Sequence, residues 1–234
     1  MRDVVRAYIE KYRLLTENRP VLVGVSGGAD SIALLTILVE SGYSCIAAHC
    51  NFHLRGDESL RDEQFVREYA RKLDVPFLMT DFDTRKYAAD RHLSIEMAAR
   101  ELRYGWFEEQ RAATGAQAVA VAHHRDDSVE TLLMNLLFEG RIGCFQPVTY
   151  LSRTDVTQIR PLLYVKEQQV RSAAAKLDLP IVHNPCPANG ETRRQEVKEL
   201  IESLSGRYPD LKQKLFGAMQ RYPLYGWNLH AEER

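Results

Sequence analysis

Apolar positions along the chain alternate between short continuous runs and longer amphipathic stretches. Residues 21–25 form an apolar run of strand length, and residues 32–38 after them are apolar enough for a packed helix. The same pair of patterns recurs downstream. It predicts further strands at 44–49, 76–82, 117–122 and 157–160, and further helices at 57–73, 95–111, 128–138 and 166–177. Strands that alternate with helices predict an α/β fold with a doubly wound parallel sheet.

The remaining segments suggest how the chain is divided. Additional helices are predicted at 4–14, 192–204 and 209–219, and irregular segments rich in Gly or Pro at 140–148 and 181–190. We therefore expect a main domain over residues 1–190 and a small helical C-terminal extension over residues 191–234. The aromatic tail of the extension is predicted to pack on the domain.

Composition excludes several classes of protein. The formal net charge of −1 gives no overall electrostatic reason to bind nucleic acid or an anionic membrane. There is no apolar run long enough to span a membrane and no signal-peptide pattern, so we expect a cytoplasmic protein without a membrane anchor. The cysteines, Cys45, Cys50, Cys144 and Cys186, form no C-x-x-C pair and predict neither a zinc site nor a disulfide framework.

A glycine-rich turn separates the first strand from its helix. It reads Ser-Gly-Gly-Ala-Asp-Ser over residues 26–31. Gly27 and Gly28 lack a Cβ, so backbone amides there can close around an anion, and the following helix presents its positive end. The spacing matches neither a Walker loop nor a dinucleotide fingerprint. It predicts a phosphate-binding turn, with an ordinary glycine-rich turn as the alternative.

Polar residues follow the predicted strands on what should be a single sheet edge. His53 and Arg55 come after the second strand, and Asp126 and Asp127 after the fourth. Because the carboxyl ends of parallel strands meet at one edge, we expect these residues near the turn. The alternatives are a solvated loop for the first pair and helix capping for the two aspartates.

Arginine pairs on two predicted helices are further candidates. Arg100 and Arg103 share a helix face with Glu96, so they could contact phosphate or form salt bridges with that glutamate. Arg193 and Arg194 are a local basic excess near the C-terminus, where a solvated helix is the alternative.

The chain resembles a known family at several motifs. The turn is similar to the S-G-G-x-D-S signature of the PP-loop ATP pyrophosphatases. Residues 48–59, 94–104 and 122–131 resemble the tRNA(Ile)-lysidine synthases of that family, so the likeness covers about residues 1–140. Residues 186–198 and 207–220 are more similar to the tRNA 2-thiocytidine synthases. Those thiolases hold an iron–sulfur cluster on a C-x-x-C pair and a later cysteine, and the missing pair here disfavours that chemistry.

The resemblance implies an adenine-nucleotide-hydrolase-like fold and specific roles for the candidate residues. ATP and Mg²⁺ are the implied cofactors, with Asp30 as the magnesium ligand and Asp126 and Asp127 as further catalytic carboxylates. The implied ATP-binding residues are Ser26, Gly27, Gly28, Ala29, Asp30, Ser31 and Ala48. The implied contacts to phosphate or tRNA are His53, Arg55, Arg100, Arg103, Arg193 and Arg194.

The implied reaction is adenylation of a carbonyl oxygen on a tRNA base. Pyrophosphate is released, and an amine, lysine in the most similar family, then displaces AMP, which makes the enzyme a carbon–nitrogen ligase. Two alternatives stay open at this point: a thiolase that uses a sulfur donor, and an ATP-binding relative without catalysis. A homodimer is also left open.

Overall fold

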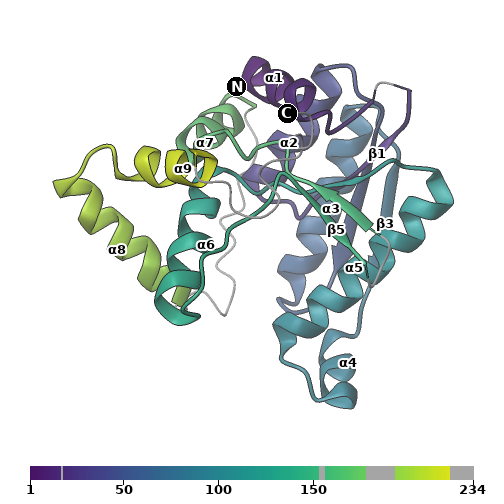
Figure 1. Cartoon of the computed structure of the whole chain (residues 1–234). Helices are drawn as coiled ribbons and strands as arrows, with labels where there is room; N and C mark the ends of the chain where they lie inside the picture. Colours follow the sequence, from purple (N-terminus) through teal and green to yellow (C-terminus); the bar gives the residue numbers. More distant parts are fainter. Residues whose placement is uncertain (17, 153–155, 178–192, 222–234) are drawn as a thin grey trace.

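Six strands form a single sheet with the order β3-β2-β1-β4-β6-β5. Figure 1 shows the sheet among its helices. The computed structural model describes residues 1–16, 18–152, 156–177 and 193–221. Neighbouring strands are parallel from β3 to β6, which confirms the predicted α/β fold with a mostly parallel sheet. The strands are β1 (Val21–Gly24), β2 (Cys45–Asn51), β3 (Phe77–Asp81), β4 (Val119–Ala120), β5 (Val148–Leu151) and β6 (Val156–Ile159).

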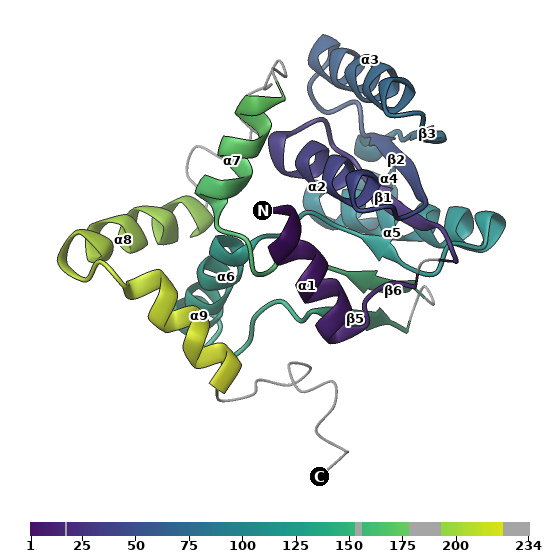
Figure 2. The same ribbon diagram turned by 90° about the horizontal axis from the view of Figure 1, so that it is seen from above.

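Helices cover both faces of the sheet (Figure 2). Ser94 begins α5 as predicted, since its hydroxyl accepts the Met97 N–H at 3.2 Å, and Gly115 with φ 67° ends that helix. The helices are α1 (Arg2–Tyr12), α2 (Ala29–Glu40), α3 (Asp57–Lys72), α4 (Thr84–Arg91), α5 (Ile95–Thr114), α6 (Arg125–Phe138), α7 (Glu167–Lys176), α8 (Arg193–Arg207) and α9 (Leu211–Arg221).

Strand β1 occupies the centre of the sheet and is buried on both faces. Val21 and Val23 belong to the larger apolar core, whereas Leu22 between them belongs to a smaller core with Tyr104 and Phe107 of α5. Successive side chains of a strand point to opposite faces of the sheet. The apolar run at 21–25 is continuous because both faces of this strand are buried. This placement brings the C-terminal end of β1 to the middle of one sheet edge.

Strand β5 is absent from the sequence prediction. Residue 148 ends a segment that we predicted to be a loop, and the structure instead begins β5 there, antiparallel to β6 at the sheet edge. An edge strand with one open face has no continuous apolar run, and Tyr150 in β5 is 61% exposed. The sheet is therefore mixed, with one antiparallel strand that the hydrophobic pattern does not reveal.

The last two described helices pack beside α6 (Figures 1 and 2). Val197 and Ile201 of α8 and Phe216 and Met219 of α9 are buried in the larger core. The predicted boundary at residue 190, the irregular segment 181–190 and the aromatic tail lie outside the described residues. Among the described helices, none combines the length and apolarity needed to cross a membrane.

The buried face of α2 gives a test of the core. Leu35 is fully buried there, so Leu35→Ala is expected to lower the free energy of unfolding by about 2–5 kcal/mol. Leu137→Ala is the matched control, because Leu137 is 56% exposed on α6 and its truncation should change stability by no more than about 0.5 kcal/mol. Urea unfolding followed by circular dichroism measures both, and equal losses would contradict the placement of α2.

Candidate active site

The glycine-rich turn is held in a fixed curl by its own serines. The Ser31 hydroxyl donates to the Gly28 carbonyl at 2.9 Å, and the Ser26 N–H donates to the Ser31 hydroxyl at 3.1 Å. Gly27 has φ +91°, a conformation that side-chain-bearing residues adopt only at a cost. Gly28 is the N-cap of α2 without a side chain to satisfy the first amides of the helix, so those donors face outward, as an anion requires.

A cavity of about 330 Å³ lies against this turn. Its walls come from the carboxyl ends of β1, β2 and β4 and from the inner face of α5. It brings together most of the predicted ATP-binding set, namely Ser26, Gly28, Asp30, Ser31 and Ala48, and it adds Arg103, His123 and Asp127. The motifs that are far apart in the sequence therefore meet at one sheet edge, as the order of strands requires.

Asp30 presents an uncompensated carboxylate to the cavity. It lies in the first turn of α2, and within the described part of the chain no hydrogen bond or ion pair is found for it. Burial raises its pKa, His124 nearby lowers it, and the negative charge of Asp127 raises it further. A buried carboxylate without a partner is costly in a folded protein, so its charge suits a cation that arrives with the ligand.

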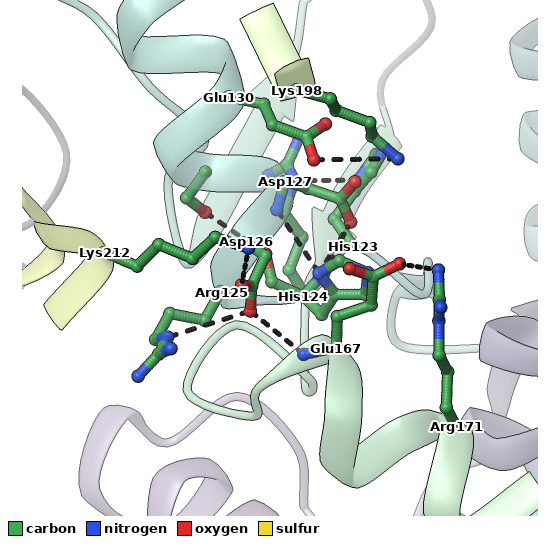
Figure 3. A network of polar contacts seen from close by, with 12 residues as sticks. His123, His124, Arg125, Asp126, Asp127, Glu130, Glu167, Arg171, Lys198 and Lys212 are labelled. Atoms are coloured by element: carbon green, nitrogen blue, oxygen red, sulfur yellow. Dashed lines mark hydrogen bonds and ion pairs between the residues drawn. The ribbon is translucent and has the colours of Figure 1, made fainter. Parts of the chain in front are cut away.

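The structure separates the two adjacent aspartates at the start of α6 (Figure 3). Asp127 lines the cavity, and its carboxylate accepts the His124 N–H at 2.9 Å in a capping box. Asp126 lies outside the cavity. It accepts the Glu167 N–H at 2.9 Å and pairs with Lys212 at 3.0 Å.

Asp126 therefore ties α6 to α7 and α9. Burial alone raises the pKa of Asp126, but the Glu167 N–H and Lys212 outweigh it and lower the pKa. Of the two predicted catalytic aspartates, Asp127 lines the cavity and Asp126 does not, and their catalytic roles stay predictions.

Glu130 is a buried acid next to Asp127 that sequence reasoning missed. It lies one helical turn after Asp127 and is only 4% exposed, and burial raises its pKa to about 7 despite Lys198 and Arg194. Arg194 lies 3.3 Å and Lys198 3.7 Å from its carboxylate oxygens (Figure 3 shows the Lys198 contact). The available signal was a glutamate between the apolar positions Val129 and Leu132 of an inward-facing helix.

His123 is held as a neutral ring, a second feature absent from the prediction. Its Nδ1 accepts the Arg160 Nε–H at 3.3 Å, and its ring stacks on Phe145 with centroids 4.2 Å apart. Burial first and the Arg160 charge second lower its pKa to about 3. With Nδ1 accepting, the ring hydrogen belongs on Nε2, so His123 offers the cavity a neutral N–H donor.

The predicted phosphate and tRNA contacts are spread over the surface. Arg103 alone among them lines the first cavity, and its guanidinium lies over the Phe52 ring. Arg100 lies over Tyr104 and Arg193 over Phe138, while Arg194 pairs with Asp127 and Glu130. Neither Arg100 nor Arg103 is paired with Glu96 among the described contacts, so the salt-bridge alternative is not what the structure contains.

The two candidates after β2 are already engaged. His53 Nε2 lies 2.7 Å from the Asp81 carboxylate at an exposed position. Arg55 forms an ion pair with buried Asp62 and lines a second cavity of about 820 Å³. That cavity shares Ser26, Cys50, Phe52 and Arg103 with the first one.

Metal and thiol chemistry are limited by the residues present. In the described ranges, no group of three or more His, Cys, Asp or Glu side chains is arranged to hold a metal ion. Burial raises the pKa of Cys45 and of Cys50 to about 12, so both thiols stay protonated near neutral pH. Cys186 lies outside the described residues.

The raised pKa of Glu130 predicts how the stability of the protein depends on pH. Folding raises its pKa from 4.5 to about 7, so between these values the folded state binds more protons than the unfolded state, and stability falls as pH rises. We expect the stability of the wild type relative to Glu130→Gln to decrease by on the order of 1–3 kcal/mol between pH 4.5 and 8.

The control is Glu196→Gln, an exposed position on α8 that should leave the pH profile unchanged. Urea midpoints across this pH range measure the effect. Parallel profiles for the wild type and Glu130→Gln would contradict the burial of this carboxyl.

Comparison with known proteins finds sequence relatives that share one name. It is 60% identical over 170 residues to the tRNA(Ile)-lysidine synthase of Parabacteroides distasonis, a match that covers 73% of this chain and 38% of the relative. It is 41% identical to the tRNA(Ile)-lysidine synthase of Bacteroides thetaiotaomicron, over 89% of this chain and 48% of the relative. The chain thus spans less than half the length of these relatives.

Solved structures agree on the fold. A U34-tRNA thiolase from Methanococcus maripaludis, solved with its 4Fe-4S cluster, superposes with a TM-score of 0.75 at 20% identity, over 94% of this chain and 77% of the other. The NMN synthetase of Francisella tularensis gives a TM-score of 0.58 at 15% identity, over 94% and 92%. The PP-loop domain matches residues 2–204, and the chain belongs to the PP-loop domain family.

Proposed function

We propose that this chain carries the ATP-dependent chemistry of a tRNA-modifying enzyme of the tRNA(Ile)-lysidine synthase type, a carbon–nitrogen ligase. The single observation that carries the proposal is the carboxylate of Asp30, which has no described partner and faces a cavity beside the glycine-rich turn at 26–31. The names of the sequence relatives support the choice of tRNA and of lysine as substrates.

ATP is proposed to lie across the carboxyl edge of the sheet. Its β and γ phosphates sit over the turn at 26–31, where the uncapped N-terminus of α2 favours anions. Its adenosine sits near Ala48, in a part of the cavity whose apolar walls include Phe107 and Val121. The α-phosphate then falls between the turn and Asp127.

Magnesium fits the residues at this edge. Asp30 and Asp127 provide two carboxylates at one cavity, and Mg²⁺ is usually held by one or two carboxylates together with substrate phosphates and water. Bound there, the ion supplies positive charge that offsets the phosphate oxygens.

The proposed reaction has two steps. The carbonyl oxygen of the tRNA base attacks the α-phosphorus, the bond to the bridging oxygen breaks, and pyrophosphate leaves. The amine of lysine then attacks the activated base carbon, and AMP departs with the former carbonyl oxygen. The Arg103 guanidinium and the neutral His123 N–H line the cavity where negative charge develops, which is the requirement for electrostatic stabilisation.

A sulfur donor is the second candidate nucleophile, favoured by the structural likeness to a tRNA thiolase. Incubation with total tRNA, ATP and labelled lysine distinguishes the lysine reaction from the sulfur-donor reaction. For either reaction we propose a cytoplasmic location. Label that appears in tRNA together with pyrophosphate supports the lysine reaction. Pyrophosphate release that requires a sulfur donor would favour the thiolase, and no release with any tRNA would overturn the proposal.

Asp30 provides the mutational test of the proposal. Asp30→Asn is expected to reduce tRNA-dependent pyrophosphate release by about 100-fold or more, because the charge that meets the phosphates and their metal is lost. Stability should stay equal or rise, since a desolvated charge is removed. Glu40→Gln at the exposed far end of α2 is the control. Full activity of Asp30→Asn would show that the turn is not the reaction site.

Gly27 tests the shape of the turn. Gly27→Ala and Gly42→Ala both place a Cβ at positive φ, +91° and +87°, so each should destabilise the protein by about 1–3 kcal/mol. Only Gly27→Ala should weaken ATP binding, at least tenfold by calorimetry, because Gly42 has nothing within 4 Å and lies away from the turn. ATP affinities that stay equal in the two variants would contradict the proposal that the turn at 26–31 binds the ATP phosphates.

A further inference from the structure

The second cavity, of about 820 Å³, opens from the wall of the first. It lies between the end of β2, the first half of α3 and the N-terminal turns of α4 and α5. Phe52 and Arg103 stand at the junction with the ATP cavity. It has more than twice the volume of the first cavity, which is about 330 Å³, and apart from the shared Ser26, Cys50, Phe52 and Arg103 its lining residues have no part in the proposed ATP site.

The opposite flank of the ATP cavity is covered. On that side Arg194 and Lys198 of α8 occupy the carboxylates of Asp127 and Glu130. Glu130 is only 4% exposed beneath them. The second cavity, past Phe52 and Arg103, gives an acceptor an approach to the ATP cavity from the flank away from α8.

The walls of the second cavity have the chemistry of a nucleotide site. Arg55 is fixed in the wall by its ion pair with Asp62, which is 2% exposed and keeps one oxygen, Oδ1, without a hydrogen-bond partner. Exposed Arg85 lies at the cavity and has no described partner, so its charge is available to a phosphate. Apolar Ile95 and Ala99 offer a surface for a base.

We propose that the second cavity binds the acceptor nucleotide of the RNA, with its base toward the Phe52–Arg103 junction and its phosphate toward Arg85. This inference rests on the proposed function, because it assigns the path by which the base carbonyl meets the ATP. A free amine is the smaller alternative occupant, and it would leave most of the volume unfilled.

The first experiment fills the cavity. Ala99→Phe adds a ring at a cavity-lining position of α5, and Ala112→Phe adds the same ring at an exposed position of the same helix. We expect Ala99→Phe to lower kcat/KM for tRNA at least tenfold in the pyrophosphate assay while ATP affinity changes less than twofold. Ala112→Phe should match the wild type. An unchanged kcat/KM for tRNA, or a raised KM for lysine alone, would overturn the inference.

A second pair of variants avoids any question of core packing. Arg85 and Lys86 are both exposed neighbours on α4, but only Arg85 lines the cavity. Arg85→Glu is expected to raise KM for tRNA at least fivefold over Lys86→Glu at the same salt concentration. Equal effects would indicate general electrostatics and overturn the inference. Wild-type protein that releases no pyrophosphate with tRNA would instead refute the proposed function itself.

Discussion

The partly buried Asp30 carboxylate beside the uncapped N-terminus of α2 is the constraint on which the proposed active edge depends. The turn at 26–31 must leave β1 at the sheet centre and enter α2 at once, so Gly27 takes φ +91° and Gly28 caps the helix without a side chain. Donors and a carboxylate are thereby held side by side, and burial raises the pKa of that carboxyl. A polyphosphate with its cation satisfies both at once, which neither an anion nor a metal alone does.

The acidic residues near Asp30 differ from it in how their charges are compensated. Asp126 pairs with Lys212 and accepts a backbone N–H, and the charge of Asp62 is paired with Arg55 through one of its two oxygens. Glu130 has Arg194 and Lys198 over it. Each of these acids is compensated by the protein itself and holds elements together. Asp30 differs because it is only half-buried and has no hydrogen bond or ion pair among the described residues, so in the proposed site its compensation comes from the ligand.

The sequence predicted those parts of the molecule that local backbone requirements encode. The parallel strands and the glycine turn follow from apolar runs and from the need for residues without a Cβ. Asp126 and Asp127 could not be told apart, because adjacent helical residues differ by about 100° in direction and only the packing of α7 and α9 decides which one faces the cavity. Glu130 and the neutral state of His123 were missed because contacts with residues far apart in the sequence, Arg194 and Lys198 for the first and Arg160 for the second, decide them. Strand β5 was missed because its one open face leaves no apolar run.

The most direct measurement of the central claim follows the oxygen of AMP. When the reaction is run with tRNA, ATP and lysine in water enriched in ¹⁸O, transfer through a base carbonyl gives AMP that carries no solvent oxygen, because its new oxygen comes from the base. Simple hydrolysis at the α-phosphate places one ¹⁸O in every AMP. Mass spectrometry of the AMP decides between them: unlabelled AMP is the predicted result, and uniformly labelled AMP would contradict the account.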